Sequence, residues 1–235
     1  MATGRLLTRR RALALLGASG AALLAGRAAA AAPAAGNVPA CVARPRQTEG
    51  PFFVDGDLER TDLRADPHGG AAKPGAPLRL KFRVFALSAA ACAPLAGALV
   101  HVWHCDAAGN YSAVRDRRAS TVGEAFLRGY QTTDAAGAAG FVTIYPGWYP
   151  GRAVHIHFKI RTAGAARSAE FTSQLYFDDA LTDRVYAAAP YASRGRPAMR
   201  NGDDFLFRDG GRQLLLDVAS EGDGYAAAFD IALQT

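Results

Sequence analysis

Short stretches of apolar residues, or of alternating apolar and polar residues, make up most of the chain after residue 33. Clusters of Gly, Pro and Asp, such as residues 134–137, separate these stretches. Alternation with a period of two buries one side of an extended strand, and turn residues between two such stretches end each strand. The pattern therefore predicts strands at residues 78–87, 98–105, 126–132, 140–145, 154–160, 173–177 and 214–218.

Helical periodicity is scarce in the same region, where residues 181–188 hold enough of a 3.6-residue pattern for one or two helical turns. Many short strands with turn residues between them are typical of a sandwich or a barrel. A chain of 235 residues suits one domain of roughly 200 residues preceded by a leader. We predict a single-domain, all-β sandwich over residues 48–235, with long loops that carry the functional site.

The first 35 residues have the pattern of an export signal. Arg9, Arg10 and Arg11 precede the 15 apolar residues 12–26, and small residues follow. Fifteen residues span a bilayer poorly, although an N-terminal membrane anchor is the alternative. Paired arginines before the apolar stretch are typical of the twin-arginine route. We predict a twin-arginine-type signal peptide at residues 1–35, a linker or arm at residues 36–47, and an exported protein that is periplasmic or extracellular, without stable membrane insertion after processing.

The net charge of +6 arises mostly in the predicted leader. Five of the 27 Lys and Arg residues lie before Pro33, and the first acidic residue is Glu49. The remaining 22 basic residues nearly balance the 21 acidic ones. A nucleic-acid-binding domain needs clustered positive charge, so we expect no nucleic-acid partner.

The chain has three cysteines, which fit an oxidising compartment if two of them pair. Cys92 follows the predicted strand 78–87, and Cys105 ends the next predicted strand. A hairpin of these strands brings the two thiols together. We predict a Cys92–Cys105 disulfide that leaves Cys41 unpaired; three buried reduced thiols are the alternative.

His155 and His157 are the strongest candidates for metal binding. Residues two apart on a strand share a face, so both imidazoles project together from the predicted strand 154–160. A rigid pair of imidazoles is suited to binding a metal ion, although two ordinary polar residues on a strand face give the same pattern. Tyr149 lies six residues before His155, and Tyr111 follows a predicted strand that ends near a Gly-Asn turn.

Two imidazoles and two phenols together favour trivalent iron. Phenolate is a hard anionic donor whose pKa, near 10, falls only beside a strong Lewis acid. Hard oxygen and imidazole suit Fe(III) better than zinc or cuprous copper. A copper site with a methionine thioether ligand is not expected, because the two methionines of the chain are Met1 and Met199. A cupin-type site needs a third histidine, and none follows His157.

With these residues the chain resembles the intradiol ring-cleavage dioxygenases, the family that includes catechol 1,2-dioxygenase and protocatechuate 3,4-dioxygenase. Several motifs carry the resemblance in the family's order, and it extends from about residue 47 to the end of the chain. The motifs are Thr48-Glu49-Gly50-Pro51-Phe52-Phe53, residues 103–111 from Trp103 to Tyr111, Pro146-Gly147-Trp148-Tyr149-Pro150, Arg152 with His155-Ile156-His157-Phe158, and Ser173-Gln174-Leu175-Tyr176-Phe177, with weaker matches at residues 201–204 and 222–225.

The resemblance implies a five-coordinate, non-haem Fe(III) site that cleaves catechols with O2 between the two hydroxyls to give a muconate-type diacid. In it, Tyr111 and His155 are equatorial ligands, Tyr149 and His157 are axial ligands, and a solvent hydroxide completes the set. A catechol binds as a chelating dianion and displaces the hydroxide and Tyr149, which take up the substrate's protons.

The resemblance also assigns Arg152 and Gln174 to the site. Arginine has no lone pair for a metal, so Arg152 is expected to stabilise negative charge that develops on the substrate ring; a surface arginine is the alternative. Gln174 is expected beside the ligands, with a solvent-facing position as its alternative. His104 stands where better-known members carry Gln, so we expect it behind the ligands.

Two departures from the family bear on what the resemblance implies. Only Pro150 and Gly151 separate Tyr149 from Arg152, a shorter loop than in better-known members, which predicts a more open site. The helical dimerisation segment of catechol 1,2-dioxygenases has no room between the predicted leader and Thr48, so their mode of dimerisation is not carried over to this chain. Two alternatives remain: a non-catalytic exported β-sandwich that binds an aromatic or carbohydrate ligand, and a zinc or copper hydrolase, which would lack an acid–base carboxylate near the histidines in sequence.

Overall fold

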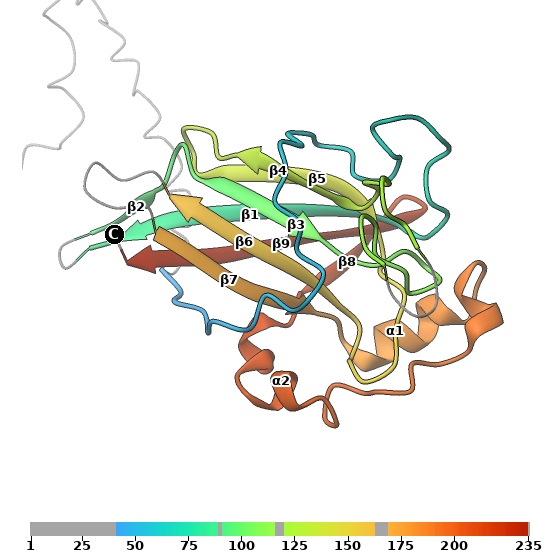
Figure 1. Ribbon diagram of the computed structural model, residues 1–235. Helices are drawn as coiled ribbons and strands as arrows, with labels where there is room; N and C mark the ends of the chain where they lie inside the picture. The colour runs from blue at the N-terminus through green and yellow to red at the C-terminus, as the bar shows by residue number, and fades with distance from the viewer. Residues whose placement is uncertain (1–40, 89–90, 116–119, 163–168, 235) are drawn as a thin grey trace, which may run out of the picture. The chain divides into compact units, whose positions relative to one another are not determined.

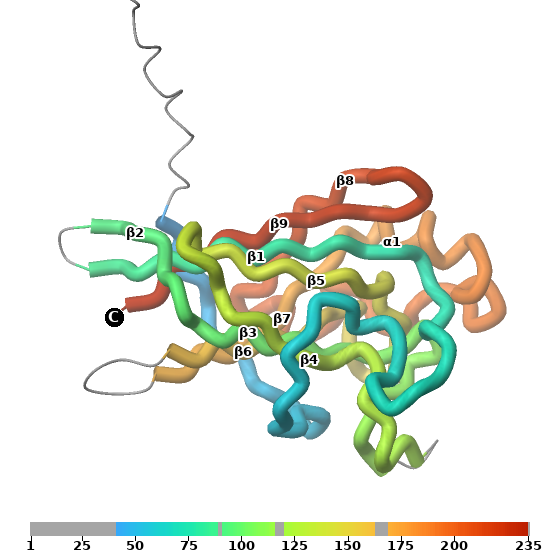
Figure 2. Tube along the Cα trace, turned by 90° about the horizontal axis from the view of Figure 1, so that it is seen from above, coloured from blue at the N-terminus to red at the C-terminus, as the bar shows by residue number. Residues whose placement is uncertain are grey.

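The computed structural model describes residues 41–88, 91–115, 120–162 and 169–234. Contacts divide the chain into two compact units, Met1–Val38 and Pro39–Thr235, and all the described residues belong to the second. The predicted signal peptide and residues 36–40 of the predicted arm lie outside the described residues. The second unit is built from two β-sheets packed face to face (Figures 1 and 2), which confirms the predicted all-β sandwich.

The first sheet has five strands in the order β2-β1-β9-β8, with β5 also paired to β1. Its long central strands β1 and β9 run parallel, and β2, β5 and β8 pair antiparallel with their neighbours. The strands are β1 (Pro77–Leu87), β2 (Cys92–Pro94), β5 (Ala138–Ile144), β8 (Val218–Glu221) and β9 (Gly224–Gln234).

The second sheet has four antiparallel strands in the order β4-β3-β6-β7. They are β3 (Leu99–Trp103), β4 (Arg128–Thr132), β6 (His155–Thr162) and β7 (Ala169–Tyr176).

The core lies between the two sheets and is made by alternate residues of each strand. Phe82 of β1 packs on Phe158 of β6 with ring centroids 5.3 Å apart, and Phe229 of β9 lies 5.5 Å from Phe158. Because side chains alternate along a strand, His155 and His157 project from the outer face of the second sheet. They are nevertheless buried, so loops must cover that face.

Short helical segments follow β7. Asp178 accepts hydrogen bonds from the backbone N–H groups of Ala180 and Leu181, a capping arrangement that starts α1 (Asp179–Tyr186). The helical turns predicted at residues 181–188 are confirmed, two residues earlier. The others are η1 (Tyr191–Arg194), α2 (Phe205–Arg208) and η2 (Gly211–Leu214). Within the described part of the chain, no helix is long and apolar enough to cross a membrane.

Six predicted strands are present as β1, β3, β4, β5, β6 and β7, and the last one is wrong. Residues 214–218 contain the end of η2 and reach β8 only at Val218. The chain instead ends in β9, which pairs with β1 along ten residues. The β9 sequence is rich in alanine, a residue with low strand propensity, and long-range pairing with β1 overrides that preference.

The N-terminal arm closes one side of the sandwich. The backbone N–H of Ala232 in β9 donates to the Val42 carbonyl at 2.8 Å, and the backbone N–H of Gln47 donates to the Thr172 carbonyl in β7 at 3.0 Å. Ser173 Oγ also donates to the Pro45 carbonyl at 2.8 Å. Residues 41–47 thus bridge from one sheet to the edge of the other, and the chain after them crosses in front of β7 and β6 (Figure 1).

The predicted Cys92–Cys105 disulfide is wrong, because Cys92 bonds to Cys41. The prediction assumed that the strands carrying the two cysteines form a hairpin. Cys92 instead starts β2 and pairs with Leu87 in the five-stranded sheet, whereas Cys105 follows β3 in the other sheet. Cys105 is buried, and its thiol donates to the Gly147 carbonyl at 3.3 Å. The disulfide therefore ties the start of the arm to the first sheet.

Candidate metal centre

The four side chains predicted as metal ligands meet at one point on the outer face of the second sheet. His155 Nε2 lies 3.0 Å from His157 Nε2, 3.1 Å from Tyr149 Oη and 3.5 Å from Tyr111 Oη. The histidines come from the start of β6, Tyr149 from the loop before it, and Tyr111 from the loop after β3. The structure therefore brings together donors that lie up to 46 residues apart in the sequence.

Hydrogen bonding orients the donor atom of His155. Its Nδ1 lies 2.6 Å from the Ala153 carbonyl oxygen. A carbonyl oxygen only accepts, so Nδ1 carries the proton and Nε2 points an unshared pair at the centre. This tautomer is assigned from the hydrogen-bond partner, as is usual for histidine.

His157 is held by packing. Its ring stacks on Trp103 with centroids 5.1 Å apart and an interplanar angle of 7°. On another side, a Cβ atom at Gly50 would lie only 3.2 Å from His157 Cε1, and the positive φ of Gly50 (70°) also favours glycine. Among the described residues, His157 Nδ1 is buried with no hydrogen-bond partner. The ring therefore has little freedom to turn away from the centre.

Burial keeps all four donors neutral when no cation is present. It lowers the pKa of His155 to about 3, with a further contribution from the positive charge of Arg152, and places the pKa of His157 well below its usual value. Burial raises the pKa of Tyr149 to about 12, although Arg152 opposes the rise, and raises that of Tyr111 well above 10. Neutral imidazoles are ready to bind a metal, whereas the phenols ionise only beside a strong Lewis acid.

The donor set fits a metal ion. If His157 carries its proton on Nδ1, two nitrogen lone pairs face and repel each other at 3.0 Å. A cation beside them would bind both nitrogens and remove this repulsion. If the proton is on Nε2, the buried Nδ1 has an unshared pair without a hydrogen bond. Two hard phenolic oxygens complete a set that suits Fe(III) better than softer ions.

Arg152 lies beside this donor set in a buried hydrogen-bond network. Its Nε donates to Asp204 Oδ2 at 2.9 Å, and its Nη2 donates to Gln174 Oε1 at 2.6 Å and to Tyr176 Oη at 3.2 Å. The side chain of Arg152 is 13% exposed and that of Asp204 is 0% exposed. Arg152 is thus no surface arginine, and its charge is fixed close to the donors.

Gln174 is fully buried on the site face of the sheet, which excludes its solvent-facing alternative. It pairs directly opposite His157 in the register of β6 and β7. Its Nε2 donates to the Thr48 carbonyl at 3.0 Å, while its Oε1 accepts from Arg152. Gln174 therefore links Arg152 to the segment that covers the site.

Two members of the network, Asp204 and Tyr176, were not predicted as site residues. Tyr176 lies two residues after Gln174 and so shares its face of β7, a signal that strand periodicity contains. Asp204 precedes α2 and accepts from the backbone N–H of Leu206 at 2.8 Å. Its sequence signal is that of a helix cap, which does not reveal the bond to Arg152.

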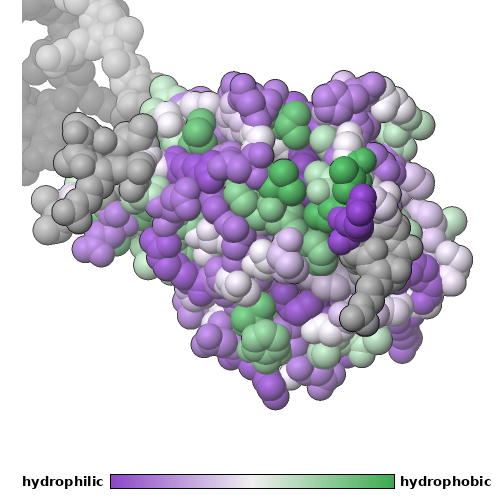
Figure 3. All heavy atoms as spheres, viewed as in Figure 1, coloured by the Kyte–Doolittle hydropathy of each residue, from purple (hydrophilic) through white to green (hydrophobic). Residues whose placement is uncertain are grey.

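The segment of residues 48–53, which we call the strap, covers the donors. Phe52 stacks on Tyr111 with ring centroids 4.3 Å apart and an interplanar angle of 19°. Phe53 packs on Trp103 at 4.8 Å, and Lys159 forms an ion pair with Glu49. On the side of the molecule that the strap crosses, apolar atoms lie scattered among hydrophilic ones (Figures 1 and 3). The strap shields the aromatic donors from water.

His104 has a structural role. Its Nδ1 donates to the Cys105 carbonyl at 2.9 Å, and its Nε2 lies 2.6 Å from Thr143 Oγ1. Both nitrogens are therefore engaged away from the four donors. The expectation that His104 is not itself a ligand agrees with this geometry.

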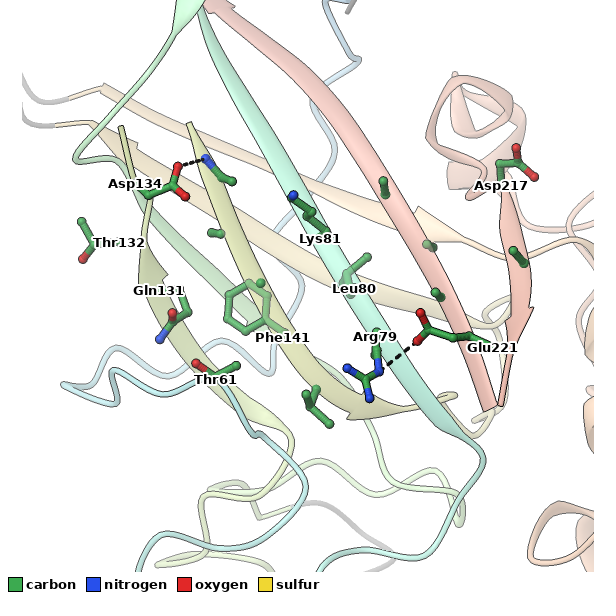
Figure 4. A pocket seen from close by; sticks show the side chains of 18 residues that line it. Thr61, Arg79, Leu80, Lys81, Gln131, Thr132, Asp134, Phe141, Asp217 and Glu221 are labelled. Carbon is green, nitrogen blue, oxygen red and sulfur yellow. Dashed lines mark hydrogen bonds and ion pairs between the residues drawn. The ribbon is translucent and has the colours of Figure 1, made fainter. Parts of the chain in front are cut away.

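A separate hollow of about 830 Å³ lies over the outer face of the five-stranded sheet (Figure 4). The residues that line it include the small residues Gly140, Ala226 and Ala228, and Arg79 and Glu221, which form an ion pair. None of the four donors lines this hollow.

The fold and the donor set define a β-sandwich protein with a buried tyrosine–histidine centre on one sheet. Residues 48–234 match the sequence pattern of the dioxygenase family Dioxygenase_C. The chain belongs to the intradiol ring-cleavage dioxygenase family.

Individual relatives agree with this assignment. The chain is 32% identical to the protocatechuate 3,4-dioxygenase beta chain of Burkholderia cepacia over 152 residues, which cover 60% of this chain and 58% of that relative. An intradiol ring-cleavage dioxygenase from Tetranychus urticae superposes with a TM-score of 0.72 at 26% identity, covering 83% of this chain and 95% of the other. The dioxygenase domain of a dioxygenase carbohydrate-binding protein fusion from Streptomyces sp. SirexAA-E has a TM-score of 0.57 at 34% identity, covering 83% and 99%.

Proposed function

We propose that this chain is a non-haem Fe(III) dioxygenase that cleaves a catechol-type diol between its hydroxyls with O2 and gives a muconate-type diacid. The observation that carries the proposal is the convergence of Tyr111 Oη, Tyr149 Oη and His157 Nε2 within 3.0–3.5 Å of His155 Nε2. Membership of the intradiol family supports catechol-type ring cleavage as the reaction class.

The four donors would hold the iron, and they differ in how firmly they are placed. A bound Fe(III) would supply the Lewis acidity that favours an ionised catechol and withdraws electron density from its ring. Tyr111 is 3% exposed beneath Phe52, whereas Tyr149 is partly exposed in the loop between β5 and β6. Tyr149 is therefore the donor that we expect to leave when a substrate enters, and its phenol oxygen would then hold a substrate proton.

Arg152 and Gln174 would act on the substrate from beside the donors. The Arg152 charge is fixed by Asp204 and Gln174 in a site with little water, where charge stabilisation is strong. Arg152 stabilises negative charge that develops on the ring, and Gln174 keeps the guanidinium in place. The strap excludes water from the donors.

We also propose that the protein is exported by a twin-arginine-type signal at residues 1–35. The Cys41–Cys92 disulfide supports this proposal, because such bonds are typical of oxidising compartments.

Iron loading followed by oxygen uptake tests the proposed function. Purified protein loaded with iron should be red to brown, because tyrosinate bound to Fe(III) gives a visible charge-transfer band. It should consume O2 with at least one of catechol, protocatechuate, hydroxyquinol or lignin-derived catechols, with one O2 consumed for each diacid formed. A zinc-loaded sample is the control and should be colourless and inert. Coloured protein that is inert with the whole panel would favour a ligand-binding sandwich, and colourless iron-loaded protein would contradict the metal centre.

A further inference from the structure

Arg128 connects the two segments that fix Tyr111. It begins β4 and is 5% exposed. Its Nε donates to Ser112 Oγ at 2.7 Å and its Nη2 donates to the Ser112 carbonyl at 2.5 Å. Its Nη1 and Nη2 each donate to the Phe52 carbonyl at 3.3 Å. One guanidinium thus binds the residue after Tyr111 and the strap residue that stacks on the Tyr111 ring.

The charge of Arg128 is unusual in its surroundings. A buried guanidinium is normally paired with a carboxylate, as Arg152 is with Asp204. All the acceptors of Arg128 are neutral oxygens, and in the described parts of the chain no carboxylate lies within ion-pair distance of it. Neutral acceptors compensate a buried charge poorly. A role as plain core packing therefore does not explain why a charged residue stands here.

We propose that Arg128 is a positioning residue for Tyr111: its planar fork clamps the Tyr111–Ser112 backbone on one side and the Phe52 cover on the other, so that the phenol oxygen is held towards His155 Nε2. The proposal rests on the proposed function only in that Tyr111 binds iron. The clamp itself is a property of the metal-free chain. The positive charge of Arg128 also lies behind a donor that would bind the metal as an anion.

Lysine cannot replace this clamp. An ammonium is a compact donor that lacks the rigid fork of arginine. The Arg128→Lys variant would keep the charge but could not reach the Ser112 and Phe52 oxygens in the same geometry. This substitution therefore separates the geometric role from the charge, and Ser112→Ala removes one acceptor while leaving Arg128 in place.

Arg60 provides a matched control. It is a partly buried arginine that also binds backbone carbonyls, those of Ala65 at 2.7 Å, Ala125 at 2.5 Å and Arg128 at 2.7 Å. It donates to no residue next to the four donors. Arg60 binds the main chain of Arg128 and not its guanidinium, so Arg60→Met removes a buried arginine while the Arg128 side chain keeps its bonds to Ser112 and Phe52.

Hydrogen exchange of the metal-free protein is the first test. Arg128→Met should speed amide exchange in residues 50–53 and 110–115 by about tenfold relative to wild type, whereas Arg60→Met should leave both segments within about twofold. Arg128→Lys should speed amide exchange in the same two segments by a smaller factor, and Ser112→Ala should speed exchange in residues 110–115. If Arg128→Met does not fold, the Arg128→Lys and Ser112→Ala variants decide. Exchange unchanged in both segments would overturn the proposal.

The visible spectrum of the iron-loaded variants is the second test, because loss of general stability would not change it. At equal iron occupancy, Arg128→Lys should shift or weaken the charge-transfer band and release iron to a chelator several-fold faster, while Arg60→Met should match wild type. Equal bands and equal iron release in the two variants would overturn the proposal. If wild type itself gives no band, the proposed function fails, and the exchange result alone decides whether Arg128 positions Tyr111.

Discussion

The Arg152 guanidinium donates to Asp204 at 2.9 Å, and the same carboxylate oxygen accepts from the backbone N–H of Ala153 at 2.8 Å. Asp204 therefore holds both the side chain and the backbone of the loop that leads into the metal-binding strand β6. Because Asp204 is fully buried, the ion pair is little screened by solvent. Asp204, which follows α1 in the sequence, thereby holds the loop that carries Arg152 beside the metal-binding strand.

Removing either partner of this ion pair should slow turnover without removing iron. We expect Arg152→Ala to keep the visible band and to lower kcat by about 100- to 1000-fold, the range for losing one group that stabilises charge. Asp204→Asn should lower kcat by about 10- to 100-fold, as for loss of a supporting partner. The measurements are iron content, visible absorbance and oxygen uptake.

Asp178→Asn is the control for the ion pair, since Asp178 caps α1 and does not bond to the site. It should cost no more than about 1 kcal/mol of stability and leave kcat unchanged. Full activity in Arg152→Ala would show that Arg152 does not stabilise the developing negative charge.

The two tyrosines should respond differently to loss of their hydroxyl groups. Tyr111→Phe should weaken the visible band and lower iron retention, because Tyr111 is the more buried oxygen donor. Tyr149→Phe should keep a band from the remaining tyrosinate and keep most of the iron. Absorbance and metal analysis after dialysis against a chelator compare them, and Tyr130→Phe, at a tyrosine hydrogen-bonded to Asp57 away from the donors, is the control. An unchanged spectrum in Tyr111→Phe would falsify its assignment as a ligand.

The Cys41–Cys92 bond should stabilise the arm and, through it, the strap. It closes a loop with a sequence separation of 51, for which chain entropy predicts a contribution of up to about 4 kcal/mol. Cys41→Ser should lower the free energy of unfolding by up to that amount and raise hydrogen exchange in residues 42–53. Denaturant unfolding measures the first and mass spectrometry the second.

A double-mutant comparison controls the disulfide prediction. Because each single substitution removes the same bond, Cys41→Ser combined with Cys92→Ser should be no less stable than either alone. Additive losses would show that the two cysteines stabilise the protein separately.

The metal-free protein should lose stability as the pH falls below about 6.5. Burial lowers the pKa of His104 to about 4 and that of His155 to about 3. Between these values and the ordinary pKa of 6.5, the unfolded chain binds protons that the folded chain does not, so acid favours unfolding. Between pH 7 and pH 5, each of these two histidines should lower the free energy of unfolding by about 2 kcal/mol, as measured by urea unfolding.

His104→Gln provides the control for this pH dependence, because glutamine does not titrate. The variant should show a smaller loss of stability between pH 7 and pH 5, by about 2 kcal/mol. Bound iron should raise the stability at each pH, since a metal that binds only the folded state stabilises it. An equal pH dependence in wild type and His104→Gln would contradict the burial argument.

Strand periodicity predicted much of the fold and the site. The positions of His155 and His157 on one face of β6 followed from the two-residue repeat, and the same rule places Gln174 and Tyr176 together on β7. The tyrosines came from their residue type and from the family resemblance. Local patterns were sufficient here because these side chains project from regular strands or lie in motifs close to them.

Long-range pairing determined what the sequence could not predict. β9 is rich in alanine and becomes a strand because it pairs with β1. Cys92 does not bond to Cys105, because β2 and the strand before Cys105 belong to different sheets; it bonds to Cys41 instead. Asp204 has the local pattern of a helix cap, while its bond to Arg152 spans 52 residues. Such relationships depend on which elements meet in three dimensions, and short-range periodicity holds no record of them.

A crystal structure of the iron-loaded protein, with anomalous scattering measured at the iron absorption edge, tests directly whether the four side chains bind iron together. We expect one iron atom bound directly by Tyr111 Oη, Tyr149 Oη, His155 Nε2 and His157 Nε2. Iron found elsewhere, or bound by the histidines with both tyrosine oxygens turned away, would contradict it.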